Sequence, residues 1–190
     1  YKVILTRNST EDEVSIYNPM GSATMANDTK SKYNLAIHHN SSGTNGGESY
    51  LHGIELYIAN DTKLDLAQSF IQSLEAEANT TTSYKENYKV DDGIYQRFFT
   101  SEEIDNDYWT TDMIYYYYLR EIGGISTHAA QNEARKGYAK NEHYNSNNTA
   151  ESYLFELGYI DNFQELQNII NNPNGYANGI AYGLTNYLKR

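Results

Sequence analysis

Two histidines and one glutamate lie at the ends of predicted strands, where their chemistry could be used. His38 and His39 follow the apolar run at residues 35–37, and Glu156 lies near the carboxyl end of the run at 152–157. In open α/β sheets, ligands bind at the carboxyl ends of strands. An imidazole that binds a metal ion and a carboxylate that transfers a proton are the two parts of metal-assisted hydrolysis. The pattern therefore indicates one hydrolytic site that both segments share.

Each of these residues also has a structural interpretation. A histidine at a strand end is more often a hydrogen-bonded structural residue than a metal ligand. Because successive residues of a strand point to opposite faces, only one of His38 and His39 should point into a site. Burying Glu156 in an apolar strand costs free energy unless the carboxylate is paired or functional, so a structural ion pair is the competing interpretation. Glu55 would either support a ligand from behind or face outward from an amphipathic strand.

The composition excludes several classes of protein. A chain of 190 residues with 39% hydrophobic content is long enough for one compact domain with a core. The formal net charge of -11 and the 14 Lys and Arg residues argue against a nucleic-acid partner, because phosphate backbones are neutralised by clustered basic side chains. There is no cysteine, so any metal must be held by His, Asp and Glu. No apolar run reaches the roughly 18 residues of a membrane helix, so no membrane insertion is expected.

The candidate residues must be positioned by strands and helices that alternate along the chain. Strands are predicted at residues 2–6, 35–37, 54–58 and 152–157, and a turn followed by a strand or extended segment at 91–99. Helices are predicted at residues 23–27, 62–79, 100–124, 127–140, 163–171 and 176–188. This alternation predicts a single domain over residues 1–190 with an α/β fold, a three-layer sandwich in which a mixed, mostly parallel sheet has helices on both faces.

Side chains that can cap a helix mark several of these boundaries. Asp, Asn, Ser and Thr accept hydrogen bonds from the free main-chain N–H groups of a first turn. The predicted caps are Asp61 or Thr62 for the helix at 62–79, Thr100 with Glu103 for the helix at 100–124, and Asp161 with Asn162 for the helix at 163–171.

Four fragments of the chain occur in an order that is fairly specific. They are KVILTR at 2–7, MANDTKSKYNLAIHHNSS at 25–42, GIELYI at 53–58, and ESYLFELGYIDN at 151–162, which is followed by a helix and YANGIAYGLTNYL. This order resembles the zinc-dependent N-acetylmuramoyl-L-alanine amidases of the Amidase_3 type. The similarity covers roughly the first sixty and the last forty residues, and residues 100–149 look like a divergent or inserted region.

The resemblance assigns roles to the residues at both strand ends. The family's Ile-His-x-Asn motif falls on residues 37–40, which implies that His38 rather than His39 is a zinc ligand and that Asn40 supports it. The family's Glu-Leu-Gly-Phe/Tyr-Ile-x-Asn motif begins at Glu156. This position implies that Glu156 activates a zinc-bound water and then protonates the leaving amine. The family's Gly-x-Glu strand matches residues 53–55, which implies a supporting role for the carboxylate of Glu55.

The implied activity is hydrolysis of the amide between N-acetylmuramic acid and L-alanine in peptidoglycan. Zn²⁺ is the implied cofactor, and the implied protein is a monomer that acts outside the cell, in the cell wall or as a phage lysin. Members of the family take a further histidine and a glutamate ligand from before the strand that matches residues 2–6. No residue here matches them, so we expect an upstream part of the domain to be missing. The alternative is a non-catalytic wall-binding or interaction module that kept the fold without a complete zinc site.

Overall fold

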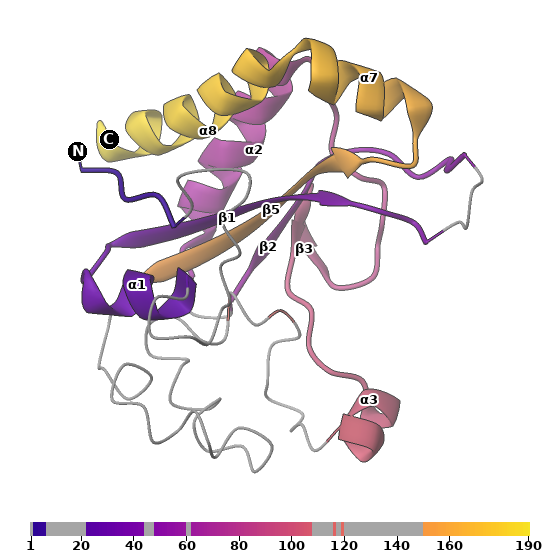
Figure 1. Cartoon of the computed structure of the whole chain (residues 1–190), viewed down its shortest axis with the longest axis horizontal. Helices are drawn as coiled ribbons and strands as arrows, with labels where there is room; N and C mark the ends of the chain where they lie inside the picture. Colours follow the sequence, from indigo (N-terminus) through magenta and orange to yellow (C-terminus); the bar gives the residue numbers. More distant parts are fainter. Residues whose placement is uncertain are drawn as a thin grey trace. The chain divides into compact units, whose positions relative to one another are not determined.

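The computed structural model describes residues 2–6, 22–43, 48–59, 62–107, 116, 119 and 150–190. The chain divides into two compact units, one made of Leu35–Arg97 with Tyr153–Arg190 and the other of Tyr1–Asn34 with Phe98–Ser152. We call the first the sheet unit, because it holds nearly all of the β-sheet and the helices α2, α7 and α8 (Figure 1). Helices α1 and α3 belong to the other unit.

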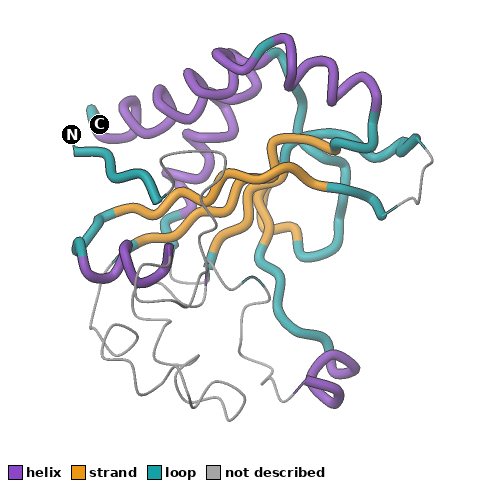
Figure 2. Tube along the Cα trace, viewed as in Figure 1, coloured by secondary structure: helices purple, strands orange, loops and turns teal. Residues whose placement is uncertain are grey.

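Five strands form one mixed sheet in the order β1-β5-β2-β4-β3. The strands are β1 (Tyr33–Asn40), β2 (Glu55–Ile58), β3 (Lys89–Asp91), β4 (Ile94–Tyr95) and β5 (Glu151–Tyr159). Strand β2 is antiparallel to β5 and parallel to β4, and β4 is antiparallel to β3. Strands β1 and β5 are neighbours in the sheet (Figure 2). They run in the same direction, since main-chain hydrogen bonds join Glu151 to Lys32 at one end and Ile160 to Asn40 at the other. These pairings confirm the predicted α/β class and its mixed sheet.

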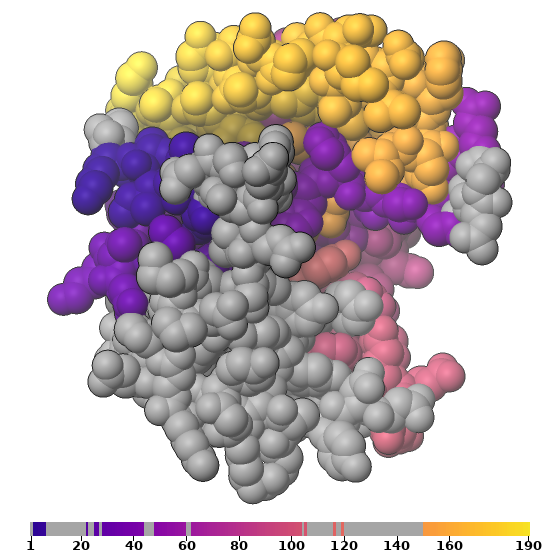
Figure 3. Space-filling model, viewed as in Figure 1, coloured from indigo at the N-terminus to yellow at the C-terminus, as the bar shows by residue number. Residues whose placement is uncertain are grey.

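Helices α2 (Leu64–Ala78) and α8 (Pro173–Leu188) form a layer on one face of the sheet, and α7 (Phe163–Asn171) lies beside α8 (Figures 1 and 3). Phe70 of α2 meets the rings of Tyr153 and Phe155 edge-on, at centroid distances of 5.3 and 5.0 Å. Aromatic pairs favour this arrangement, and both strand residues are almost fully buried. The apolar stripe of α2 is therefore what fixes the helix layer to β5.

The two long helices approach each other very closely. A Cβ atom at Gly183 of α8 would lie 2.7 Å from the Cα atom of Phe70, a distance that real Cβ atoms do not adopt. The hydroxyl of Ser69 also donates a buried hydrogen bond to the carbonyl oxygen of Gly183 at 2.8 Å. Glycine at this position allows the two backbones to come into contact.

Most predicted elements are present, with shifted boundaries. The predicted helices at 62–79, 163–171 and 176–188 correspond to α2, α7 and α8, and the one at 23–27 to α1 (Ser22–Asp28). The predicted helix at 100–124 begins as α3 (Ser101–Asp107), where Thr100 and Glu103 form the expected reciprocal bonds of 2.8 and 3.3 Å. Apart from residues 116 and 119, the rest of that helix lies outside the described residues, as do the helix at 127–140 and most of the proposed divergent region.

Two predictions of local structure are wrong. Residues 2–6 do not form a strand, and Val3 and Leu5 are 79% and 66% exposed. An apolar run becomes a strand only when a neighbouring backbone pairs with it, and the described residues provide no such partner. The N-cap of α2 is Lys63, which makes no capping side-chain bond, rather than Asp61 or Thr62. Asp65 compensates by accepting a hydrogen bond from the N–H of Leu66 at 3.0 Å.

None of the helices within the described ranges has the length and apolar character needed to span a bilayer. A helix layer on the second face of the sheet stays a prediction, because α2, α7 and α8 all belong to the layer on the first face (Figure 1).

Candidate hydrolytic site

Glu55 and Glu156 lie opposite each other on adjacent strands. They are Cα partners in the antiparallel ladder between β2 and β5, so their side chains share one face of the sheet. Phe155, the neighbour of Glu156, contacts Phe70 of α2. Since side chains alternate along a strand, the two glutamates occupy the face that points away from α2 and α8.

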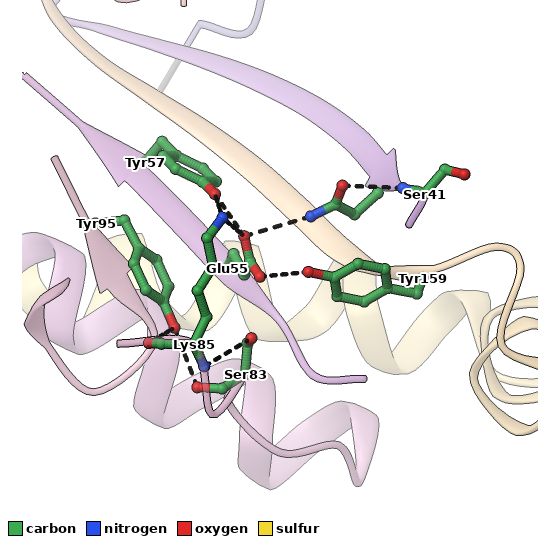
Figure 4. Close-up of polar contacts among 8 residues, drawn as sticks. Ser41, Glu55, Tyr57, Ser83, Lys85, Tyr95 and Tyr159 are labelled. Atoms are coloured by element: carbon green, nitrogen blue, oxygen red, sulfur yellow. Dashed lines mark hydrogen bonds and ion pairs between the residues drawn. The ribbon is translucent and has the colours of Figure 1, made fainter. Parts of the chain in front are cut away.

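The carboxylate of Glu55 is the centre of a buried polar network (Figure 4). Its Oε2 atom accepts hydrogen bonds from the Tyr57 hydroxyl at 2.6 Å, from Asn40 Nδ2 at 3.3 Å and from Lys85 Nζ at 3.4 Å. Its Oε1 atom accepts one from the Tyr159 hydroxyl at 2.6 Å. The residue is only 1% exposed, which rules out the outward-facing alternative for Glu55. An ionised carboxylate accepts hydrogen bonds only, so these donors suit its charged form.

Lys85 approaches this carboxylate from the segment that follows α2. Its Nζ atom donates to the Tyr57 hydroxyl at 2.6 Å and lies 5.3 and 5.6 Å from the ring centroids of Tyr57 and Tyr95. Ring faces attract a cation at such distances. The Tyr95 hydroxyl in turn donates to the carbonyl oxygens of Ser83 and Lys85, each at 3.1 Å. Lys85 is therefore held at two points: Tyr57 binds its ammonium group, and Tyr95 binds its main-chain carbonyl oxygen.

Glu156 is in a very different state from Glu55. It is 8% exposed, and its Oε2 atom is buried with no hydrogen-bond partner in the part of the chain that the structure describes. No ion pair of Glu156 is found there either, so the competing structural interpretation gains no support from these residues. Burial and then the charge of Glu55 raise the pKa of Glu156 to about 7, against a smaller lowering by Lys85. A carboxyl group with such a pKa can both accept and release a proton at neutral pH.

The two histidines of β1 point to different faces. Asn40 reaches Glu55, so strand alternation places His38, two residues earlier, on the same face as the glutamates and His39 on the other. His38 is half-buried, and its pKa is lowered by burial and by the neighbouring His39. A neutral imidazole is the form that binds a metal. The geometry favours His38 over His39, while its role as a ligand stays a prediction.

A zinc ion requires more donors than this face offers. Catalytic zinc sites have three protein ligands. Within the described ranges, no three His, Asp or Glu side chains come together in a group that could hold a metal ion. The oxygens of Glu55 are already engaged by four donors, which leaves His38 and Glu156. The described residues therefore do not fit a zinc ion by themselves.

Helix α7 fixes the strand ends that carry the site. Asn162, one of the predicted cap residues, is its N-cap and accepts bonds from the N–H groups of Gln164 and Glu165. The carboxylate of Glu165 accepts from the N–H of Gly53, just before β2, and from the N–H of Tyr159, at the end of β5, each at 2.7 Å. One side chain thus joins the start of the Glu55 strand to the end of the Glu156 strand.

Sequence reasoning missed the three residues that surround Glu55. Tyr57 carried a usable signal, because it lies two positions after Glu55 and must share its face of the strand. Tyr159 lies three positions after Glu156, which in a regular strand would put it on the other face. Gly158 has a φ of 140°, and this conformation interrupts the alternation. Lys85 lies in a segment without regular pattern and gave no signal.

The fold and the site define an α/β protein whose sheet carries a buried carboxyl group suited to proton transfer. A profile of the Amidase_3 family, described as N-acetylmuramoyl-L-alanine amidase, matches residues 1–186. The chain therefore belongs to the N-acetylmuramoyl-L-alanine amidase family.

Solved structures show the same fold. The catalytic domain of CwlV, an N-acetylmuramoyl-L-alanine amidase from Bacillus (Paenibacillus) polymyxa var. colistinus, is 21% identical with a TM-score of 0.56, and the match covers 99% of this chain and 73% of that one. Cwp6 from Clostridium difficile is 17% identical with a TM-score of 0.57, and the match covers 96% of this chain and 21% of that one. A search of curated proteins finds no match.

Proposed function

We propose that this protein hydrolyses the amide bond between N-acetylmuramic acid and L-alanine in peptidoglycan. Membership of the amidase family supports the substrate class. The observation that carries the chemistry is Glu156, a buried carboxyl group whose pKa is raised to about 7 and whose Oε2 atom makes no hydrogen bond within the described residues. A buried carboxyl group with a pKa near 7 and one oxygen without a partner among these residues has the properties of a general acid and base.

The proton transfers follow from the two charge states of Glu156. In its ionised form it takes a proton from the attacking water, whose oxygen bonds to the amide carbon. In its protonated form it then gives that proton to the amide nitrogen as the carbon–nitrogen bond breaks, so that the amine of L-alanine leaves. Glu55 takes no part in these transfers, because its oxygens are engaged by the hydrogen bonds of Tyr57 and Tyr159.

The zinc ion belongs to the proposal with one assigned ligand, His38, and with Asn40 and Glu55 as supporting residues. No other ligand is assigned, and no step above depends on the metal. Elemental analysis of the purified protein tests the assignment: His38→Ala should lower the zinc content, whereas His39→Ala, the matched change on the opposite face of β1, should not. Equal zinc in the parent and both variants would remove His38 from the ligand set.

The proposed place of action is the cell wall, reached from outside the cell or as a phage lysin. A non-catalytic wall-binding module is the second candidate, and it is favoured by the donor set of the described residues, which falls short of three metal ligands. Such a module would sediment with purified peptidoglycan and release nothing from it.

The decisive experiment compares Glu156→Gln with the parent protein on purified peptidoglycan. Release of new amino-terminal L-alanine is measured, and Glu156→Gln should reduce the rate by about 10²- to 10⁴-fold, the usual contribution of general acid–base catalysis. Glu77→Gln, the same change at an exposed position of α2, is the control and should keep the parental rate. Full activity in Glu156→Gln would exclude the proposed role of Glu156, and wall binding without release by the parent would favour the second candidate.

A further inference from the structure

Glu55 and Glu156 lie opposite each other, so two negative charges at these positions would repel. Side chains directly opposite each other on an antiparallel pair have Cβ atoms about 5 Å apart, and like charges there repel. Glu55 and Glu156 hold such positions, and both are buried. A low dielectric strengthens the repulsion. If Glu55 is charged, Glu156 can ionise in the working pH range only when another charge balances that of Glu55.

Three of the four donors to Glu55 cannot supply that charge. Tyr57, Tyr159 and Asn40 orient the carboxylate oxygens, but they are neutral groups. Lys85 is the fourth donor, and its ammonium group forms an ion pair with Glu55 Oε2 at 3.4 Å (Figure 4). It also donates to the Tyr57 hydroxyl, which donates to the same Oε2 atom, so that charge and hydrogen bonds act on one oxygen.

We propose that Lys85 is a positioning residue of the hydrolytic site, whose positive charge balances Glu55 so that the opposite Glu156 can release its proton near neutral pH. This inference rests on the proposed function of Glu156. Lys85 does not need to touch the substrate, because it acts through Glu55. The side chain of Lys85 is 34% exposed, whereas that of Glu55 is fully buried. The ammonium group therefore lies at the edge of the site, next to a carboxylate in the interior.

The other titratable groups around Glu156 do not supply the positive charge that balances Glu55. On the same face, β1 contributes His38, whose pKa is lowered so that it is neutral near pH 7. Strand β2 contributes Glu55 and Tyr57, and β5 itself contributes Tyr159, whose pKa is raised by burial and by Glu55. Neither tyrosine carries a positive charge in any state. The influence of Lys85 on Glu156 is also of the required sign, since it lowers the pKa of that carboxyl.

The charge balance predicts a compensating pair of substitutions. Removing the charge of Lys85 leaves Glu55 unbalanced, so Glu156 should hold its proton more tightly. Removing the charge of Glu55 as well should cancel this effect. A lysine that only packed between Tyr57 and Tyr95 would behave differently, because a second substitution in the same cluster would add damage rather than repair it.

The experiment is a ¹³C NMR titration of the Glu156 carboxyl in the purified full chain, accompanied by the pH profile of peptidoglycan hydrolysis. In Lys85→Met, both midpoints should move up by about one pH unit, the size expected for losing one charge at this range. Lys85→Arg keeps the charge and should keep the parental midpoints. The double variant Lys85→Met/Glu55→Gln should bring the midpoint of Glu156 back to the parental value or below it.

Two results would exclude the proposed role of Lys85. An unchanged Glu156 midpoint in folded Lys85→Met, or a double variant with a higher midpoint than the single one, would overturn it. Should Lys85→Met fail to fold by circular dichroism, Lys85→Gln removes the charge, keeps a donor, and must show the same upward shift. The NMR midpoint is independent of activity, so a shifted midpoint together with full activity in Glu156→Gln would contradict the proposed function and leave the charge balance intact.

Discussion

The sheet face that α2 and α8 cover is held by rings and close backbone contact, whereas the opposite face of β2 and β5 holds two buried carboxyl groups. On the first face, Phe70 meets Tyr153 and Phe155, and burial stabilises the fold. On the second face, Glu156 is buried without a hydrogen bond to Oε2 from any described residue, and its burial costs free energy. The same two strands thus stabilise the fold through one face and destabilise it through the other.

This difference shows how a small sheet can carry a reactive group. A well-packed apolar layer offsets the free-energy cost of burying the Glu156 carboxyl. Residues with a function are often not the ones that would give the highest stability. Removing the Phe70 ring should therefore lower the free energy of unfolding, whereas replacing the carboxyl of Glu156 with a neutral group should raise it.

The largest expected effect is on the helix-covered face. Phe70→Ala removes the ring that contacts both Tyr153 and Phe155, and it should lower the free energy of unfolding by about 4 kcal/mol, as is usual for a buried phenylalanine. Urea denaturation followed by circular dichroism measures the loss. Leu64→Ala, on the same helix at a position 39% exposed, is the control and should cost far less. Equal losses would mean that the ring contacts do not hold the helix layer.

A slightly smaller loss is expected where the helices touch. Gly183→Leu places a side chain where even a Cβ atom would lie 2.7 Å from Phe70, so α8 must move away from α2 at a cost of about 3 kcal/mol. Ala181→Leu introduces the same side chain at an exposed position of α8 and should be close to neutral. Thermal melting of both variants distinguishes close contact from helix propensity, because propensity favours leucine over glycine and only slightly disfavours leucine relative to alanine.

On the carboxylate face the sign should reverse. The pKa of Glu156 is raised to about 7 in the folded chain, above its ordinary value of 4.5, so its protonated form favours folding. The stability it contributes is fully present below about pH 4.5 and is lost as the pH rises through 7. Glu156→Gln cannot ionise, so at pH 8.5 it should be more stable than the parent by about 2 kcal/mol and at pH 4.5 nearly equal to it.

Denaturation at both pH values checks this prediction, with the exposed Glu77→Gln as control. A parent protein that is as stable as Glu156→Gln at pH 8.5 would show that the carboxyl is solvated or paired, and the contrast between the two faces would then disappear.

The smallest effect belongs to the network around Glu55. Tyr159→Phe removes the donor that lies 2.6 Å from Oε1 of the buried Glu55 carboxylate, and this loss should cost about 1.5 kcal/mol, the low end for a hydrogen bond to a charged group, while the three donors to Oε2 remain. Tyr182→Phe, at a position 47% exposed on α8, serves as the matched change. A loss above 3 kcal/mol would mean that Tyr159 is essential to the network rather than one of several supports.

The sequence predicted elements well where one physical signal dominated. The apolar runs of β2 and β5 and the periodic stripes of α2 and α8 were correctly identified, because burial on a fixed period determines them. The length of β1 was underestimated: the strand was predicted at residues 35–37 with the histidines at its end, whereas β1 extends from Tyr33 to Asn40. The short strand β3 was missed as well, since pairing with β4 rather than apolar content creates it.

The candidate site was predictable only in part. His38 and Glu156 could be selected because strand ends and buried carboxylates are visible in a sequence. The state of Glu55 could not be foreseen, since Lys85 and Tyr159 reach it from distant segments. The strand predicted at residues 2–6 was wrong because apolar content alone does not make a strand. A strand also needs a neighbouring backbone to pair with, and the sequence of this run does not specify one.

The contact between Gly183 and Phe70 also has a consequence for biosynthesis. Helix α2 ends at Ala78 and α8 begins at Pro173, so α2 leaves the ribosome well before its partner helix is synthesised. Until then, the apolar stripe of α2 lacks its partner and is open to wrong associations with other nascent chains. Productive folding of the sheet unit must therefore wait until α8 has been synthesised, and chains that stop before α8 should aggregate instead of accumulating in a partly active form.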